Sequence, residues 1–148
     1  MVKDMALTTT PEENKQIIHR FVEEVVNNGN YDRIDELVAE DLIDQTPFGE
    51  TRGRDALRDT MTQIRTAFPD FSVTSHEIVA EGDSVAVRMN QRGTHEGEFM
   101  SLEPTGRTFD IEAMGFARLE DGQIAERWAQ PDMLGLLQQL GVVESPGE

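Results

Sequence analysis

The stretch EDGQIAERWAQPDMLGLLQQLG, residues 120–141, decides the fold and carries most of the functional signal. With RTFDIEAMG at 107–115 it predicts two strands, Arg107–Gly115 and Gln123–Ala129, hinged on the Glu120-Asp121-Gly122 turn. An apolar helix follows and closes the domain. The second strand delivers Trp128, and a lone carboxylate, Asp132, comes four residues later at the helix start. This order predicts an acid/base group at the mouth of a pocket.

Two more strands are predicted upstream, where the hydrophobic pattern has a period of two. They span Phe71–Val79 and Ser84–Thr94, separated by a turn at Glu81-Gly82-Asp83. On the second of them, the face that we expect to be interior carries Val85, Val87 and Met89.

Helices are predicted before the strands. Thr10, Pro11 and Glu13 have the spacing of a capping box with proline at the first helical position. Gly29 is expected to end this helix in the left-handed conformation. A short helix at Asp32–Ala39 and a longer one at Arg54–Phe68 follow. The buried stripe of the first helix is predicted to comprise Ile17, Ile18, Phe21, Val22, Val25 and Val26.

The order of these elements predicts an α+β fold, in which N-terminal helices pack on one face of a curved, mostly antiparallel sheet. At 148 residues the chain is long enough for one core. We expect a single domain at residues 10–141, with flexible ends at 1–9 and 142–148.

Composition excludes several classes of function. The chain has no cysteine, so disulfides and thiolate chemistry are excluded. It has no signal-peptide pattern and no run of about 18 apolar residues, which predicts a cytoplasmic protein that does not span a membrane. Histidines and carboxylates show no metal-ligand spacing, and we expect no metal and no cofactor.

The charge is strongly acidic, with 29 Asp and Glu against 13 Lys and Arg and a net charge of −16. A field of this sign disfavours nucleic-acid binding. Scattered acid with only two lysines, Lys3 and Lys15, predicts a halophilic source, where salt screens the self-repulsion. An ordinary acidic protein from a high-GC genome is the alternative.

Across residues 12–141 the chain resembles the SnoaL-like polyketide (ester) cyclase family. The fragments that carry the resemblance are Asn28-Gly29-Asn30, Phe68-Pro69-Asp70, Glu81-Gly82-Asp83, Gly93–Phe99, Pro104–Arg107, Arg118–Ile124, Glu126-Arg127-Trp128 leading to Asp132, and Gln139-Leu140-Gly141. The resemblance implies a ketosteroid-isomerase-like cone around an apolar cavity, cofactor-free chemistry on a hydrophobic small molecule, and a homodimer or higher oligomer packed through the sheet.

Asp132 matches the aspartate that the family is thought to use as its acid/base. Such a carboxylate would take a proton from a carbon between two carbonyls, and an apolar pocket would raise its basicity. The alternative is that Asp132 simply caps the last helix. Both roles can coexist in one residue.

Gln45, His95 and Trp128 are the predicted substrate-binding residues. Gln45 departs from the histidine that many similar proteins have there, and an amide can orient a carbonyl but cannot shuttle a proton. His95 is predicted to hydrogen-bond a substrate carbonyl or orient a neighbour, with a solvent-facing or turn-capping histidine as the alternative. Trp128 is predicted to be a cavity wall, with plain core packing as the alternative. For Glu126 we expect a structural ion pair with Arg88 or Arg118.

Two classes of function remain open. The first is a cofactor-independent enzyme of lyase or isomerase type that closes a ring by an aldol reaction, or a related isomerase or dehydratase that uses the same aspartate. The second is a non-catalytic module of the same fold that binds small apolar ligands or dimerises. The Gln45 departure and the capping alternative for Asp132 favour the second.

Overall fold

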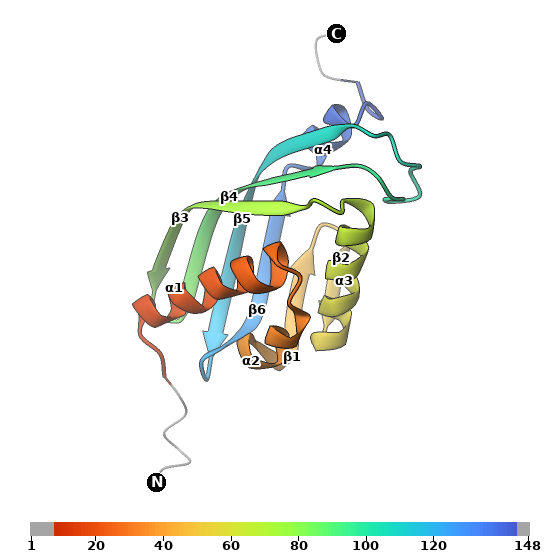
Figure 1. Ribbon diagram of the computed structural model, residues 1–148. Coiled ribbons are helices and arrows are strands. Elements are labelled where there is room, and N and C mark those ends of the chain that lie inside the picture. The colour runs from red at the N-terminus through yellow and green to blue at the C-terminus, as the bar shows by residue number, and fades with distance from the viewer. Residues whose placement is uncertain (1–7, 145–148) are drawn as a thin grey trace.

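A single six-stranded sheet, in the order β2-β1-β6-β5-β4-β3, is the frame of the computed structural model, which describes residues 8–144 (Figure 1). All neighbouring strands are antiparallel except β1 and β6, which are parallel. The predicted α+β class with a mostly antiparallel sheet is confirmed. The strands are β1 (Val38–Thr46), β2 (Gly49–Arg52), β3 (Ser72–Glu81), β4 (Ser84–Thr94), β5 (Thr108–Glu120) and β6 (Gln123–Pro131).

The first helix lies across one face of the sheet (Figure 1). It begins as α1 (Pro11–Arg20), and the predicted capping box between Thr10 and Glu13 is present in full. It continues without a break into a π-helical segment, η2 (Phe21–Asn27). Gly29, at φ +68°, ends it in the left-handed conformation as predicted. Four members of the predicted stripe are buried, namely Ile18, Phe21, Val22 and Val25.

The short second helix is shorter than the prediction of Asp32–Ala39. It consists of η3 (Tyr31–Arg33) and α2 (Ile34–Leu37), and Val38 already belongs to β1. The reason is tertiary: Val38 pairs with Ile124 of β6, so sheet pairing overrides local helix propensity at this boundary. Ile34, Leu37 and Val38 are buried.

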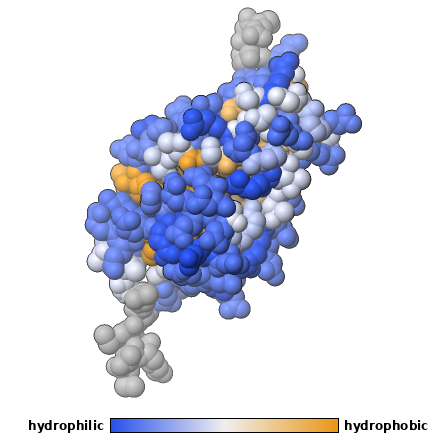
Figure 2. Space-filling view, viewed as in Figure 1, coloured by the Kyte–Doolittle hydropathy of each residue, from blue (hydrophilic) through white to orange (hydrophobic). Residues whose placement is uncertain are grey.

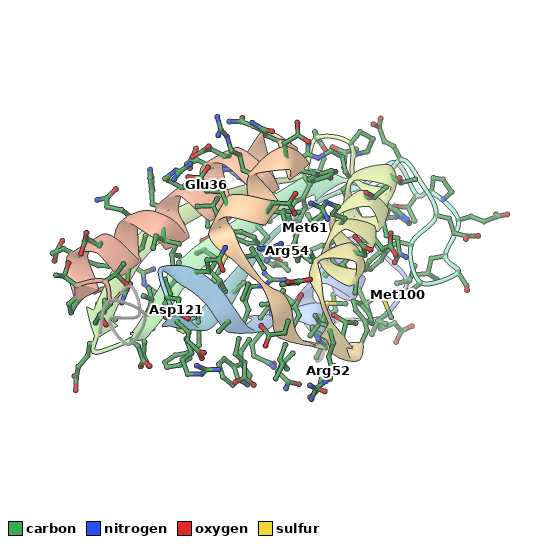
Figure 3. All side chains as sticks on the ribbon, turned by 90° about the horizontal axis from the view of Figure 1, so that it is seen from below. Glu36, Arg52, Arg54, Met61, Met100 and Asp121 are labelled. Atoms are coloured by element: carbon green, nitrogen blue, oxygen red, sulfur yellow. The ribbon has the colours of Figure 1, made fainter. Side chains whose placement is uncertain are left out.

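The two remaining helices cover the other parts of the sheet. Helix α3 (Arg54–Ala67) packs on β1 and β2, and Figure 3 shows its Met61 directed between the helix and the sheet. Helix α4 (Met133–Gln139) follows β6 directly and packs on β5. Strands β5 and β6 run longer than predicted, to Glu120 and Pro131, because the Asp121-Gly122 hairpin lets them pair along their length.

The two faces of the sheet differ in character. The face toward the helices carries Val85 and Val87, which are buried as predicted, and beside them the partly buried Met89. The face away from the helices exposes several large apolar side chains, including Val79, Met114 and Phe116. In contrast, the helix side of the molecule is largely hydrophilic, with small apolar patches (Figure 2).

The ends of the chain bear on the predicted domain bounds. Residues 1–7 and 145–148, which hold most of the predicted flexible ends, lie outside the described residues. Nearer the domain, Thr9 donates to Asn14 and the amide of Val142 donates to Leu137 O. Between residues 8 and 144, no helix is both long and apolar enough to cross a membrane.

Candidate functional site

An apolar cavity of about 160 Å³ lies between the helices and the inner face of the sheet. Each layer contributes to its wall: Phe21 and Val22 from η2, Met61 from α3, Met89 from β4, Ile111 from β5 and Leu136 from α4. Phe48, in the β1–β2 turn, also lines the cavity and is 62% exposed, so the cavity opens beside it. Phe99 packs edge-on against Phe48 at 6.2 Å and forms the other side of this mouth.

Asp132 lies between two lining residues of this cavity, Pro131 and Met133, but does not itself line it and is exposed. Its Oδ1 accepts a hydrogen bond from the Gly135 amide at 2.9 Å, so Asp132 is the N-cap of α4. Within the described part of the chain, Oδ2 has no hydrogen-bond partner. The capping role is therefore present, and the acid/base role stays a prediction.

Gly135 makes this capping geometry possible. A Cβ added there would lie 2.8 Å from Cγ of Asp132, closer than real Cβ atoms come. A helix of seven residues would ordinarily gain from alanine at this position, because glycine costs about 1 kcal/mol in a helix interior. The glycine is thus explained by the carboxylate that sits over it.

His95 is completely buried, at the base of the loop between β4 and β5. Its Nδ1 accepts a hydrogen bond from the Thr105 amide at 3.2 Å, and Nε2 is buried with no hydrogen-bond partner among the described residues. The ring packs against Phe68, a lining residue, at 5.6 Å. The structure therefore places His95 one layer behind the cavity wall, and its predicted contact with substrate stays a prediction.

Gln45 and Trp128 lie side by side on the outer face of the sheet. They are register partners across β1 and β6, and the Trp128 ring packs edge-on against Phe116 at 5.6 Å. Trp128 borders the cavity through its carbonyl, 3.7 Å from the position of a Cβ on Gly115. Gln45 donates to Glu50 at 2.9 Å, and this bond, followed by Arg52, lowers the pKa of Glu50. Neither side chain is brought to Asp132, and their substrate-binding role stays a prediction.

A buried ion pair is the feature that the sequence analysis missed. Asp44 of β1, 1% exposed, accepts a hydrogen bond from Arg127 Nη2 at 2.9 Å. Arg127 lines the cavity, and its guanidinium lies over the Phe21 ring at 5.4 Å from the centroid. It is the one charged side chain in the lining among residues 8–144. The available signal was position along the strands: Asp44 follows the buried Leu42 by two residues and so shares its face, and Arg127 lies on the opposite face to Trp128.

The expected partner of Glu126 is Arg118. Their side chains lie 3.8 Å apart on the outer face, and Arg118 also bonds Glu120 at 3.0 Å. Arg88, the other candidate, pairs with Glu77 instead. Among the described residues, no three histidine or carboxylate side chains gather in a way that could hold a metal ion.

The fold and site together define a small α+β protein with an apolar pocket that opens beside Phe48 and has Asp132 next to two of its lining residues. The chain belongs to the SnoaL-like polyketide cyclase family, whose model matches residues 16–140. The predicted resemblance is therefore confirmed.

Individual relatives have low sequence identity to this chain. The aklanonic acid methyl ester cyclase DnrD of Streptomyces peucetius is 28% identical over 129 residues, covering 84% of this chain and 88% of that protein. The nogalonic acid methyl ester cyclase of Streptomyces nogalater is 28% identical over 118 residues, covering 78% and 88%. Among solved structures, wild-type IdmH of Streptomyces antibioticus has a TM-score of 0.77 at 33% identity, covering 87% of this chain and 99% of IdmH. TsrD of Streptomyces laurentii has a TM-score of 0.82 at 26% identity, covering 91% and 99%.

Proposed function

We propose that the protein is a cofactor-independent cyclase that closes a ring in a hydrophobic polyketide ester by an intramolecular aldol reaction. The observation that carries the proposal is the place of Asp132 in the chain, between Pro131 and Met133, two lining residues of a cavity formed mostly by apolar side chains. The relatives named as aklanonic and nogalonic acid methyl ester cyclases support this substrate class.

The proposed reaction needs one proton-transfer group and no oxidant or reductant. Asp132 takes a proton from a carbon flanked by two carbonyls, and the electron pair of that C–H bond forms the enolate. The enolate carbon attacks a carbonyl carbon of the same molecule, which makes one C–C bond and leaves an alkoxide. Protonated Asp132 then returns its proton to the alkoxide oxygen, so the product is an isomer of the substrate.

The experiment is incubation with aklanonic acid methyl ester and with nogalonic acid methyl ester. The proposal expects a product of unchanged mass and different retention on chromatography, formed by the wild type and lost in Asp132→Asn. Full turnover by Asp132→Asn would refute the role of the aspartate. Absence of any product from a panel of such esters would refute the cyclase activity.

A second candidate function is a non-catalytic module that binds a small apolar molecule. It is favoured by the capping bond of Asp132 and by Gln45, whose amide is engaged by Glu50 on the other face of the sheet. This candidate expects saturable binding of a polyketide ester that is recovered unchanged. An isomerase or dehydratase with the same aspartate would instead release a product with a shifted double bond or a mass lower by one water.

We further propose that two copies pack through the outer face of the sheet. Val79, Met114 and Phe116 are 54%, 61% and 42% exposed on that face, and exposed apolar side chains on one face of a sheet are typical of an interaction surface. The measurement is mass by light scattering: the wild type should be a dimer, and Phe116→Glu should be a monomer. A monomeric wild type would refute this. Cytoplasmic location and salt adaptation of the source stay predictions.

A further inference from the structure

The Asp44–Arg127 pair has unsatisfied hydrogen-bonding groups although it is buried. One bond joins Arg127 Nη2 to Asp44 Oδ2 at 2.9 Å. The neighbouring atoms, Arg127 Nε and Asp44 Oδ1, are both buried and have no hydrogen-bond partner within residues 8–144. A two-point pairing would have satisfied them, so the pair is held through one end of the guanidinium only. Unsatisfied buried groups in a folded protein call for an explanation, because each has lost its hydrogen bonds to water without a replacement.

The remaining donor, Nη1, makes no hydrogen bond to any of the described residues. Nη2 is bonded to Asp44 and Nε is buried, while the side chain as a whole keeps 18% of its surface accessible. Arg127 lines the cavity, and its guanidinium carbon lies 5.4 Å from the centroid of the Phe21 ring. The cavity therefore contains one cationic donor in a mostly apolar wall.

Asp44 decides which kind of ligand group fits this donor. A guanidinium can only donate hydrogen bonds, so the ligand must offer an acceptor. Because Asp44 already balances the charge of Arg127, a second carboxylate would be left partly uncompensated in a low-dielectric site. A neutral carbonyl oxygen needs no such compensation.

We propose that Arg127, held in place by Asp44, binds a carbonyl oxygen of the ligand at the inner end of the cavity. This proposal depends on the proposed function in one respect only, namely that the cavity is the ligand-binding site. Arg127 and Asp132 are five positions apart on β6 and its continuation, about 16 Å along an extended strand. The bound carbonyl is thus remote from the carbon that Asp132 would deprotonate, and it serves to orient an elongated molecule.

The proposal is tested with two probes of one carbon skeleton, 1-tetralone and tetralin, which differ by a single carbonyl. Their bicyclic size suits a cavity of about 160 Å³. The wild type should bind 1-tetralone more tightly than tetralin. Asp44→Leu/Arg127→Met, which replaces both charges by apolar side chains, should reduce that preference about tenfold or more, the value of a hydrogen bond to a charged donor. Its affinity for tetralin should change less than about twofold, because no polar contact to tetralin is removed.

The matched control is Arg118→Gln/Glu126→Gln. It removes an ion pair from the outer face of the neighbouring strands β5 and β6, and it should leave the preference for the ketone unchanged. No preference in the wild type, or the same preference in Asp44→Leu/Arg127→Met, would overturn the proposal, even where both affinities fall together.

If Asp44→Leu/Arg127→Met does not fold, NMR spectra of the wild type labelled with ¹⁵N-arginine test the proposal instead. Side-chain signals of Arg127 that shift with 1-tetralone and not with tetralin support the proposal, and equal responses overturn it. These measurements involve no turnover. If the protein prefers the ketone through Arg127 but cyclises no ester, this inference holds and the cyclase proposal is refuted. If it cyclises an ester but shows no ketone preference that depends on Arg127, the cyclase proposal holds and this inference is refuted.

Discussion

Asparagine and alanine at position 132 separate the two roles of the aspartate. The side chain of Asp132 accepts one hydrogen bond, from the Gly135 amide, and Asn caps helices about as well as Asp. Asp132→Asn should therefore change the free energy of unfolding by only a few tenths of a kcal/mol. Asp132→Ala removes the cap, which costs about 1 kcal/mol, and should lower Tm by about 2–4 °C in a chain of this size.

Activity should follow a different order. Both substitutions remove the carboxylate, so ring closure of the polyketide methyl esters should fall by about 10²–10⁴ in kcat in each. The assays are product formation by chromatography and thermal unfolding by circular dichroism, on the same preparations. Asp132→Asn with wild-type Tm and wild-type kcat would refute the acid/base role. Asp132→Asn with the same loss of Tm as Asp132→Ala would refute our account of the cap.

Three further predictions concern Gly135, the hydrogen bonds between Thr94 and Asp70, and the net charge of the chain. Gly135→Ala should displace the Asp132 carboxylate and lower kcat without touching the acid itself, and unaltered kcat would contradict the close packing between them. Bonds from the Thr94 hydroxyl and amide lower the pKa of Asp70, so its contribution to stability is present above the unfolded pKa of about 3.9 and is lost as pH falls through the lower folded value. Acid titration of unfolding should accordingly show a weaker dependence below about pH 4 in Asp70→Asn than in the wild type, and identical slopes would argue against it. With a net charge of −16, Tm should rise steeply between about 0.1 M and 1 M salt, and a flat Tm would contradict halophilic adaptation.

Local signals predicted the elements that local chemistry determines. The Glu81-Gly82-Asp83 turn and the alternation after it predicted β4 to its exact bounds, Ser84–Thr94, and the capping box predicted the start of α1. Asp132 could be recognised as a cap because its partner is only three residues away. In each case the residues that form the interaction are close in sequence, so their pattern is visible without the fold.

Strand β1 could not be predicted in this way. Its sequence, VAEDLIDQT, is rich in acidic residues and has no strong strand pattern, and it is a strand because it pairs with β6 far along the chain. For the same reason Asp44 looked like an ordinary surface carboxylate, and Arg127 was overlooked beside the more conspicuous Trp128. Whether a charged side chain can be buried depends on the residue that pairs with it. Arg127, the partner of Asp44, lies 83 residues away in the sequence.

The parallel pairing of β1 with β6 also has a consequence for how the protein is made. During synthesis at about 5–20 residues per second, β1 waits roughly 4–17 seconds for the residues that will cover its open edge and neutralise Asp44. Until then the nascent chain can form the β1–β2 hairpin and α3, but it exposes an unpaired strand edge to other chains. The negative charges of Glu40 and Asp41 within β1 would repel a second copy during this interval, so the acidity that obscured the strand in the sequence would protect it on the ribosome.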